Sequence, residues 1–513
     1  MAAAIQLPLA GGSIIGGKFL FDEQNAGDQH PITSPSNRQK TVGSYSLASK
    51  EDIEQAFSLA STAQPEWDSF GGEYRAMLLN KMADALEHEI PTLMSIIVAE
   101  AGRTIADALA EVREAIDFCR YYAEQAITHF SIPISLPGPT GEQNQLSLHG
   151  RGVFLCISPW NFPLAIFTGQ IAAALAAGNT VVAKPASSTP LIATYTVRLF
   201  HKAGIPINNL QLVIGPGGTA SKLMLTNKYL SGVVFTGSNE TAKHLHQQLS
   251  QRPGAILPLI AETGGQNVMI ADSTALPEQL VDDVIQSAFF SAGQRCSALR
   301  VLYLQEDIAD DILTMLAGAL QTYRVGDPAK LCTDIGPVID ERAQQHLLQH
   351  IEKMMEEGHL ISKLPLPPEL RLTDQKHGSF LAPHIFEINS LEQLPEEVFG
   401  PILHVIRYRA DELNDVLTQI NNNGYGLTLG VHSRIQAFAD YIFNHTMVGN
   451  TYINRNMVGA VVGTNPFGGC GLSGTGPKAG GPHYLLRFAT EKTRTENITA
   501  RGGNTALFRL LED

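Results

Sequence analysis

Cysteine is scarce in this chain, and its spacing fits neither a disulfide framework nor a zinc site. The 513 residues include five cysteines, and no two of them form a CxxC pair. A small and odd number of cysteines favours reduced thiols over disulfides, and we therefore expect a cytoplasmic protein. The sixteen histidines form no HExxH motif. We predict that the protein has no metal site.

Positive charge and long apolar runs are also in short supply. Lys and Arg total 36 against 50 Asp and Glu, which gives a net charge of -14. Such a chain repels phosphate backbones and anionic membranes, so we expect no nucleic-acid partner. No uncharged apolar run reaches the length of a membrane span. No basic residue precedes Lys18, so we expect no secretory or mitochondrial signal here.

Apolar residues are plentiful: 44% of the chain is hydrophobic, enough for about two or three domains with buried cores. Tyr74, Leu78, Met82 and Leu86 recur at helical spacing, which predicts mostly amphipathic helix over the first hundred-odd residues. Another helix is predicted through residues 111–118. It ends before a Pro/Gly-rich stretch at 133–141, which indicates a projecting arm.

From Gly152 onward the pattern changes to short apolar runs separated by helical segments. The runs cover residues 153–157, 180–183, 210–214, 232–235 and 257–261, and the helices between them 165–177, 190–203, 219–225 and 241–249. This alternation predicts an α/β fold with a mostly parallel sheet. It resumes over residues 280–448, which indicates a second α/β domain beginning near Asp272. Residues 484–499 alternate imperfectly and are predicted to form an edge strand.

A candidate nucleophile lies in the segment FSAGQRCSALR, residues 290–300. Cys296 follows a glycine-containing turn and is adjacent to Arg295. A neighbouring cation lowers the pKa of a thiol, so we expect a raised thiolate fraction at Cys296. Taken alone, an inert buried cysteine is the more common case.

Two further candidates lie where predicted strands end. Glu262 precedes two glycines in LIAETGGQN, and partial burial there would raise its pKa toward that of a general base. Asn161 follows the strand at 153–157 within SPWNF, where its amide could donate to an oxyanion. A capping glutamate and a turn asparagine are the ordinary alternatives for each residue by itself.

Other strand ends carry groups suited to a nucleotide. Lys184 ends the strand at 180–183, and Gly237 and Ser238 enter the helix at 241–249, where free amides favour a phosphate. The common GxGxxG fingerprint is absent.

These segments occur in a distinctive order: SPWNFP, AKPAS, FTGS, ETGGQN, GQRCSA, EVFGP and NPFGG. Over residues 16–499 the chain resembles the aldehyde dehydrogenase superfamily. The segments AEVREAIDFCRYYA, PGPTGEQN, GNTYINRNMVGAVVG and GLSGTGPKAGGP resemble the L-glutamate γ-semialdehyde (1-pyrroline-5-carboxylate) dehydrogenases, as in the C-terminal module of bifunctional proline-utilisation proteins. The proline dehydrogenase barrel and DNA-binding segment of those relatives have no counterpart here, so we expect a monofunctional enzyme.

The resemblance implies an aldehyde dehydrogenase-like α/β fold. It comprises a Rossmann-like cofactor domain (residues 1–128 and 150–270), an α/β catalytic domain (271–455) and a β oligomerisation arm (129–149 and 484–500). It also implies a homodimer or larger homo-oligomer, with a functional link to a proline dehydrogenase.

The implied reaction oxidises L-glutamate γ-semialdehyde to glutamate through a thiohemiacetal and a thioester on Cys296, with Asn161 holding the oxyanion and Glu262 activating water. NAD is the implied cofactor. NADP remains an alternative, because Ser187 stands where many NAD-preferring relatives have an acidic residue that repels a 2′-phosphate. The implied cofactor contacts are Ser158, Trp160, Lys184, Ser187, Gly237, Ser238, Glu397 and Phe399. The implied substrate contacts are Glu114, Phe162, Ser297, Gly459, Ala460 and Phe467.

Other functions stay open on sequence grounds. Succinate semialdehyde dehydrogenases also contain KPAS, so another semialdehyde is an alternative substrate. An inactive binding protein is an alternative of another class, which the joint presence of Cys296, Glu262, Asn161 and Lys184 disfavours. A cysteine protease would need a histidine base, and no motif near Cys296 nominates one.

Overall fold

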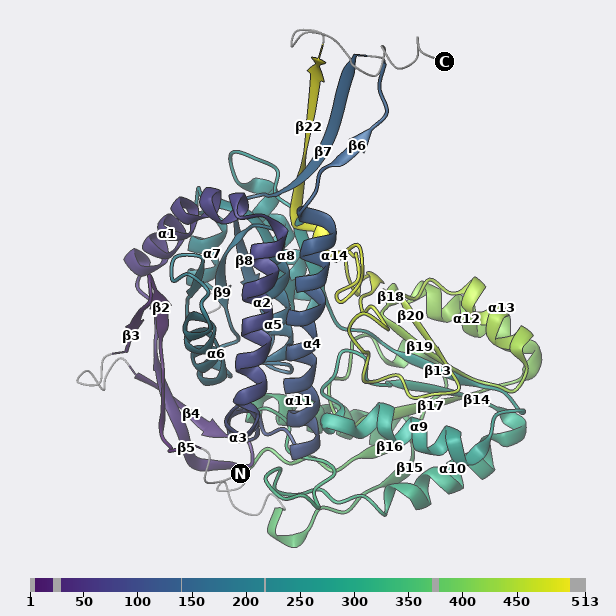
Figure 1. Cartoon of the computed structure of the whole chain (residues 1–513). Helices are drawn as coiled ribbons and strands as arrows, with labels where there is room; N and C mark the ends of the chain where they lie inside the picture. The colour runs from purple at the N-terminus through teal and green to yellow at the C-terminus, as the bar shows by residue number, and fades with distance from the viewer. Residues whose placement is uncertain (1–4, 22–28, 140, 216–217, 371–377, 499–513) are drawn as a thin grey trace.

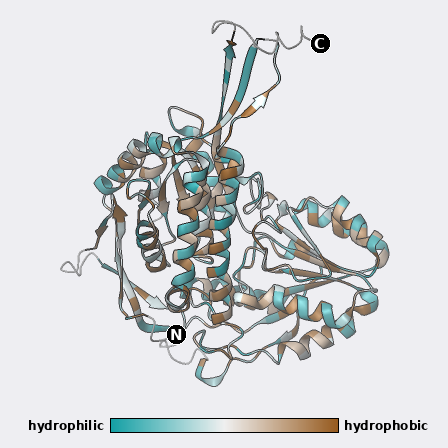
Figure 2. Ribbon diagram, viewed as in Figure 1, coloured by the Kyte–Doolittle hydropathy of each residue, from teal (hydrophilic) through white to brown (hydrophobic). Residues whose placement is uncertain are grey.

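The computed structural model describes residues 5–21, 29–139, 141–215, 218–370 and 378–498. Figure 1 shows two α/β bodies side by side, with a narrow β-arm projecting from the first. Strands of both bodies are apolar in the interior, whereas the outward turns of the helices are polar (Figure 2). No helix among the described residues is long and apolar enough to cross a membrane.

The N-terminal segment starts with strands and continues with helices. The strands are β1 (Leu9–Gly11), β2 (Ser13–Ile15), β3 (Lys18–Leu20), β4 (Gln29–Ser34) and β5 (Asn37–Ser46). The helices are α1 (Lys50–Ser69), α2 (Gly71–His88), α3 (Ile90–Ala101) and α4 (Ile105–Phe130). The prediction of helix is therefore wrong before Lys50. Three of these strands span only three residues, too few for an alternating pattern to emerge.

The first large sheet has the order β12-β11-β8-β9-β10-β2-β3. The first five strands in this order are parallel: β8 (Val153–Ile157), β9 (Thr180–Lys184), β10 (Leu210–Leu212), β11 (Leu230–Thr236) and β12 (Leu259–Glu262). The connecting helices are α5 (Ala165–Ala176), α6 (Pro190–Ala203), α7 (Thr219–Leu225) and α8 (Asn239–Gln251). Each predicted strand and helix of this region is confirmed to within two residues.

The second large sheet has the order β15-β16-β17-β14-β13-β19-β20. Its strands are β13 (Val268–Ala271), β14 (Val301–Gln305), β15 (His359–Lys363), β16 (His384–Glu387), β17 (Ile402–Tyr408), β19 (Thr428–His432) and β20 (Asn450–Ile453). Around it lie α9 (Pro277–Phe289), α10 (Glu306–Leu320), α11 (Glu341–Glu357), α12 (Leu413–Asn422) and α13 (Gln436–His445). The second α/β unit is confirmed. β13 pairs with β14 and β19, so the chain changes sheets between Glu262 and Val268, slightly before the predicted boundary at 271.

The arm is a three-stranded antiparallel sheet with the order β22-β7-β6. It consists of β6 (Ile134–Leu136), β7 (Glu142–Gly150) and β22 (Ala489–Asn497), and α14 (Tyr484–Arg487) leads into β22. The edge strand predicted over residues 484–499 is therefore confirmed for Ala489–Asn497, whereas the prediction is wrong for residues 484–487, which form α14. Thr140 and residues 499–500 of the predicted arm lie outside the described residues. A two-stranded sheet of β18 (Tyr425–Gly426) and β21 (Cys470–Gly471) lies apart from these sheets.

Candidate active site

Strand register in the first sheet gathers the predicted polar residues at one edge. Ile157 is paired with both Lys184 and Phe235, and Thr236 is paired with Glu262. Because the strands are parallel, Ser158, Lys184, Gly237 and Glu262 all lie at their carboxyl ends. Open α/β sheets bind ligands at this edge.

Cys296 lies in the loop between α9 and β14. The loop begins with a 3-10 turn, η2 (Phe290–Gly293), in which Ser291, Ala292 and Gly293 have φ angles of 58°, 54° and 66°. A Cβ on Gly293 would lie 2.1 Å from the carbonyl oxygen of Gly400. Glycine is therefore required at the end of this left-handed turn, which directs the chain toward Cys296.

Hydrogen bonds from two buried side chains fix the loop. Asn267 donates from Nδ2 to the carbonyl oxygens of Cys296 at 2.5 Å and Ala298 at 2.9 Å. Arg300 donates to the carbonyl oxygens of Gly293 at 2.7 Å and Arg295 at 3.0 Å. The backbone of the nucleophile is thus held at several points, as a preorganised site requires.

The expectation of a lowered thiol pKa is wrong for this structure. Burial raises the pKa of Cys296 to about 12, and the carboxylates of Glu397, Glu262 and Glu114 add to the rise. Arg295 opposes it, but its guanidinium pairs with Asp107 at 2.8 Å. Arg295, the cation next to Cys296 in the sequence, lowers the thiol pKa less than burial and the carboxylates of distant segments raise it.

Glu262 ends β12 and lies beside a glycine-rich segment. Its Oε2 accepts a hydrogen bond from the Gly469 N–H at 3.2 Å. Burial raises the pKa of Glu262 well above its usual value, in the direction that we predict for a general base.

Asn161 and Phe162 occupy the turn after β8. The Asn161 amide donates from Nδ2 to the carbonyl oxygen of Gln294 at 3.3 Å, two residues before the nucleophile. The Phe162 ring contacts the guanidinium groups of Arg103 and Arg295, which lie 5.3 and 5.1 Å from its centroid. Asn161 is therefore placed beside the Cys296 loop by the sheet and by this packing.

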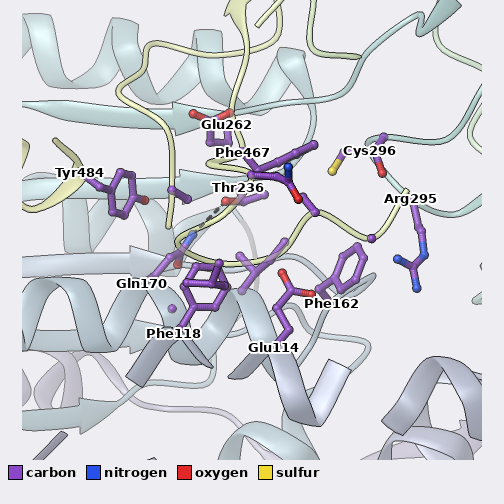
Figure 3. Close-up of a pocket in the computed structure, with 18 of the residues that line it drawn as sticks. Glu114, Phe118, Phe162, Gln170, Thr236, Glu262, Arg295, Cys296, Phe467 and Tyr484 are labelled. Carbon is purple, nitrogen blue, oxygen red and sulfur yellow. Dashed lines mark hydrogen bonds between the residues drawn. The ribbon is translucent and has the colours of Figure 1, made fainter. Parts of the chain in front are cut away.

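A pocket with an empty volume of about 910 Å³ joins most of the predicted chemical residues. Cys296, Glu262 and all six predicted substrate residues line it: Glu114, Phe162, Ser297, Gly459, Ala460 and Phe467. Figure 3 shows Glu114 and Phe162 across the pocket from Glu262 and Cys296. Burial raises the pKa of Glu114 to about 7, against the opposing field of Arg295.

Sequence reasoning missed several lining residues. Phe118 and Tyr122 lie on α4, four and eight positions after Glu114, and line the same pocket. Helical spacing from Glu114 would have nominated both. Gln170 of α5 donates to Thr236 at 3.1 Å, and both residues line the pocket (Figure 3). A single glutamine within an apolar helix gives no comparable signal.

The predicted cofactor residues form a second group, outside the pocket lining. The Trp160 and Phe399 rings meet edge to face at a centroid distance of 5.7 Å. Glu397 accepts a hydrogen bond from Arg300 at 3.2 Å. Ser238 caps α8 by accepting from the Thr241 N–H at 3.3 Å. Residues from both bodies therefore meet beside Cys296.

This second group fits a nucleotide. Ser158 has a buried Oγ with no hydrogen-bond partner among the described residues. Lys184 is 6% exposed, and burial lowers its pKa. An orphaned hydroxyl and a desolvated ammonium are groups that a bound polar ligand would satisfy. Position 237 accepts only a glycine without a local shift, because a Cβ there would lie 2.6 Å from the Phe235 ring. Ser187 is exposed to solvent.

Comparison with known proteins defines the class. Residues 21–494 match the aldehyde dehydrogenase family, and the chain belongs to this family. It is 48% identical to the bifunctional protein PutA of Klebsiella aerogenes over 91% of this chain and 35% of that protein. It is 34% identical to the 1-pyrroline-5-carboxylate dehydrogenase of Geobacillus thermodenitrificans over 94% of this chain and 92% of that protein. The chain spans about a third of the length of the PutA proteins it matches.

Solved structures agree with this membership. The proline utilization A protein of Bradyrhizobium japonicum superposes with a TM-score of 0.86 at 52% identity, covering 89% of this chain and 46% of that one. A 1-pyrroline-5-carboxylate dehydrogenase from Thermus with bound NAD gives a TM-score of 0.88 at 32% identity, covering 95% of this chain and 93% of that one. The predicted aldehyde dehydrogenase-like fold is confirmed.

Proposed function

We propose that this protein oxidises L-glutamate γ-semialdehyde, the open form of 1-pyrroline-5-carboxylate, to L-glutamate with NAD. The observation that carries the proposal is the single pocket lined by Cys296, Glu262 and the substrate residues of the segment 459–467. Relatives that match nearly end to end are named 1-pyrroline-5-carboxylate dehydrogenases. One of the similar structures holds NAD.

The first half-reaction is assigned to Cys296 and Asn161. The Cys296 sulfur attacks the aldehyde carbon and forms a thiohemiacetal. The Asn161 amide and the Cys296 N–H are the donors assigned to the oxyanion. When bound, NAD supplies the hydride acceptor and a positive charge that favours the thiolate. Loss of hydride converts the thiohemiacetal into a thioester on Cys296.

The second half-reaction is assigned to Glu262. Its carboxylate takes a proton from water, which attacks the thioester and releases the carboxylate product and the Cys296 thiol. A raised pKa suits this role, because the base must accept a proton near neutral pH. The carboxylate must nevertheless be ionised when water is activated.

Substrate selection is assigned to charged and polar groups around the pocket. Ser297 and the amides of Gly459 and Ala460 would hold the α-carboxylate, and Glu114 would meet the α-ammonium group. Phe162 and Phe467 would enclose the short aliphatic chain between two apolar faces. A pKa of about 7 leaves Glu114 partly ionised at neutral pH.

Cofactor contacts follow the second group of residues. Lys184 would bind the adenosine ribose, Gly237 and Ser238 the pyrophosphate, and Glu397 with Phe399 the nicotinamide ribose and its surroundings. Ser158 and Trp160 belong to the same lining. Ser187 carries no charge to repel a 2′-phosphate, so NADP is an alternative cofactor. The domain roles follow: cofactor binding by the first α/β body and catalysis by the second.

The same proposal includes assembly and location. β6 and β22 are the edges of the projecting arm, and an arm with free edges is suited to joining subunits into a homodimer or larger assembly. The five cysteines are free, which fits a reducing cytoplasm. A link to a proline dehydrogenase would supply the substrate.

Steady-state kinetics with 1-pyrroline-5-carboxylate and each cofactor test this function. Succinate semialdehyde is the competing substrate in the same assay. Turnover of succinate semialdehyde alone would replace the proposed substrate. Dehydrogenase activity in a Cys296→Ala variant would overturn the mechanism, whereas a folded wild-type protein inactive on every aldehyde would favour a binding role.

A further inference from the structure

A cradle of glycines encloses the Glu262 carboxylate. Gly469 donates its N–H to Oε2 at 3.2 Å. A Cβ on either Gly468 or Gly474 would lie 2.9 Å from a carboxylate oxygen. The other oxygen, Oε1, is buried and has no hydrogen-bond partner among the described residues. The cradle therefore brings the backbone close but does little to replace the water that an ionised carboxylate loses.

Three titratable groups from different elements face Glu262: Lys478, Tyr484 of α14 and Cys296. Burial holds the pKa of Tyr484 well above its usual value, and that of Cys296 is about 12. Both are therefore neutral near pH 7. Lys478 is the cation of the three, and its field favours the ionised form of Glu262. Thr236, which ends β11 and pairs with Glu262, and Gly237, which follows it, carry no charge.

Lys478 is fixed behind the cradle rather than beside the carboxylate. Its neighbour Ala479 exchanges backbone hydrogen bonds with Phe467 at 2.8 and 2.9 Å. Its Nζ donates a hydrogen bond to the carbonyl oxygen of Gly449, just before β20. Gly468 lies between the two charged residues, because a Cβ there would be 2.9 Å from Glu262 Oε1 and 3.2 Å from Lys478 Cα. The ammonium is held in place and acts on Glu262 through space.

We propose that Lys478 is a positioning residue for Glu262: from behind the glycine cradle its positive charge opposes the effect of burial, favours the ionised carboxylate and thereby sets the lowest pH at which the thioester is hydrolysed. The inference rests on the proposed function, because it concerns the hydrolysis assigned to Glu262. Lys478 lies outside the lining of the pocket. We therefore expect Lys478 to affect hydrolysis of the thioester much more than its formation on Cys296.

Infrared difference titration tests the electrostatic part without substrate or cofactor. Subtracting the spectrum of a Glu262→Gln variant from that of the wild type isolates the carboxyl band of Glu262. Lys478→Met is expected to raise the pKa of Glu262 by roughly one unit or more, the size of effect produced by a nearby opposite charge. Lys478→Arg keeps the charge and is expected to leave the pKa nearly unchanged. An unchanged pKa in Lys478→Met overturns the proposal, and Lys478→Gln serves as a second neutral variant if the methionine variant does not fold.

Transient kinetics with 1-pyrroline-5-carboxylate and NAD test the consequence. Steady-state turnover of Lys478→Met should fall about tenfold on the acid side of the profile, because each unit of pKa reduces the ionised fraction tenfold. The loss should narrow at high pH, and the initial burst of reduced cofactor should stay within about twofold. Lys330→Met, at an exposed position, is the matched control. An equal loss at every pH, or loss of the burst, would reduce Lys478 to a structural role. A wild type that does not reduce NAD with 1-pyrroline-5-carboxylate refutes the proposed function, while the infrared titration still decides the role of Lys478.

Discussion

Arg295, the residue before the nucleophile, pairs with Asp107 of α4 at 2.8 Å, and both side chains are almost completely buried. Ser291 donates to the same carboxylate at 2.5 Å. The ion pair connects the first α/β body to the loop that carries Cys296. It also turns the charge of Arg295 toward Asp107, which leaves burial as the main influence on the thiol.

Removing this pair should destabilise the whole protein. Asp107→Asn leaves Arg295 without its buried counterion, and breaking a buried pair costs about 3–5 kcal/mol. The free energy of unfolding in urea is the measurement. Asp84→Asn is the control, since Asp84 pairs with Arg120 at the surface at 2.9 Å and exposed pairs contribute about 1 kcal/mol or less. Equal losses from the two variants would contradict this account.

The Cys296 thiol should react slowly with iodoacetamide in the protein without cofactor. Its pKa of about 12 keeps the thiolate fraction small at pH 7, and alkylation should accelerate as the pH rises toward that pKa. Glu397→Gln removes the carboxylate that, after burial, does most to raise the pKa of the Cys296 thiol. It should lower the thiol pKa and speed alkylation about three- to tenfold, the effect of half a unit to one unit. A Cys332→Ser background removes the exposed thiol, and mass spectrometry locates the label. Alkylation of Cys296 as fast as that of a free thiol would show that the site does not suppress the thiolate.

Gly293→Ala should disrupt the turn before the nucleophile. The new Cβ would lie 2.1 Å from the Gly400 carbonyl, at a φ of 66° that side chains rarely adopt. We expect a loss of more than about 2 kcal/mol in unfolding free energy, together with loss of dehydrogenase activity. Gly318→Ala lies in α10 with no atom near its new Cβ, and should stabilise the helix by roughly 0.5–1 kcal/mol. Normal activity in Gly293→Ala would show that the turn is not needed.

Asn161→Ala should reduce the rate of the first half-reaction. If its amide stabilises the oxyanion, removing the donor costs about 100- to 1,000-fold in kcat. Asn161 makes one hydrogen bond, at 3.3 Å, to the Gln294 carbonyl, so the melting temperature should change little. The single-turnover rate of reduced-cofactor formation separates the two effects. A variant with an unchanged rate would remove Asn161 from the oxyanion site.

Ser187→Glu should sharpen the choice of cofactor. Ser187 is exposed near Lys184 at the end of β9, and a carboxylate there would repel a 2′-phosphate. We expect kcat/KM with NADP to fall by at least about tenfold relative to NAD, because unfavourable like-charge contacts cost several kcal/mol. Ser187→Gln is the uncharged control of matched size. An equal change in both cofactors would place Ser187 away from the ribose.

The strands and helices from 153 to 262 were predictable because each apolar run is bounded by turn residues and each helix is long enough to show its period. The three-residue strands β1 to β3 were not, since three residues are too few to show alternation and β1 and β2 pair with the distant strands β5 and β10. The joining of Cys296, Glu262 and Glu114 in one pocket followed from the family resemblance, which implied a role for each residue. The thiol pKa did not, because Glu397 and Glu262 reach Cys296 only through the folded chain.

The change of sheet after Glu262 has a mechanical consequence. Glu262 ends the first sheet and Val268 begins the second. The short link between them is anchored on one side by Thr263, whose N–H donates to the Ser473 carbonyl at 3.0 Å. On the other side Asn267 holds the Cys296 carbonyl. The spacing between base and nucleophile is therefore set by a link of five residues that is tied down at both ends, so the two residues keep their separation although they belong to different sheets.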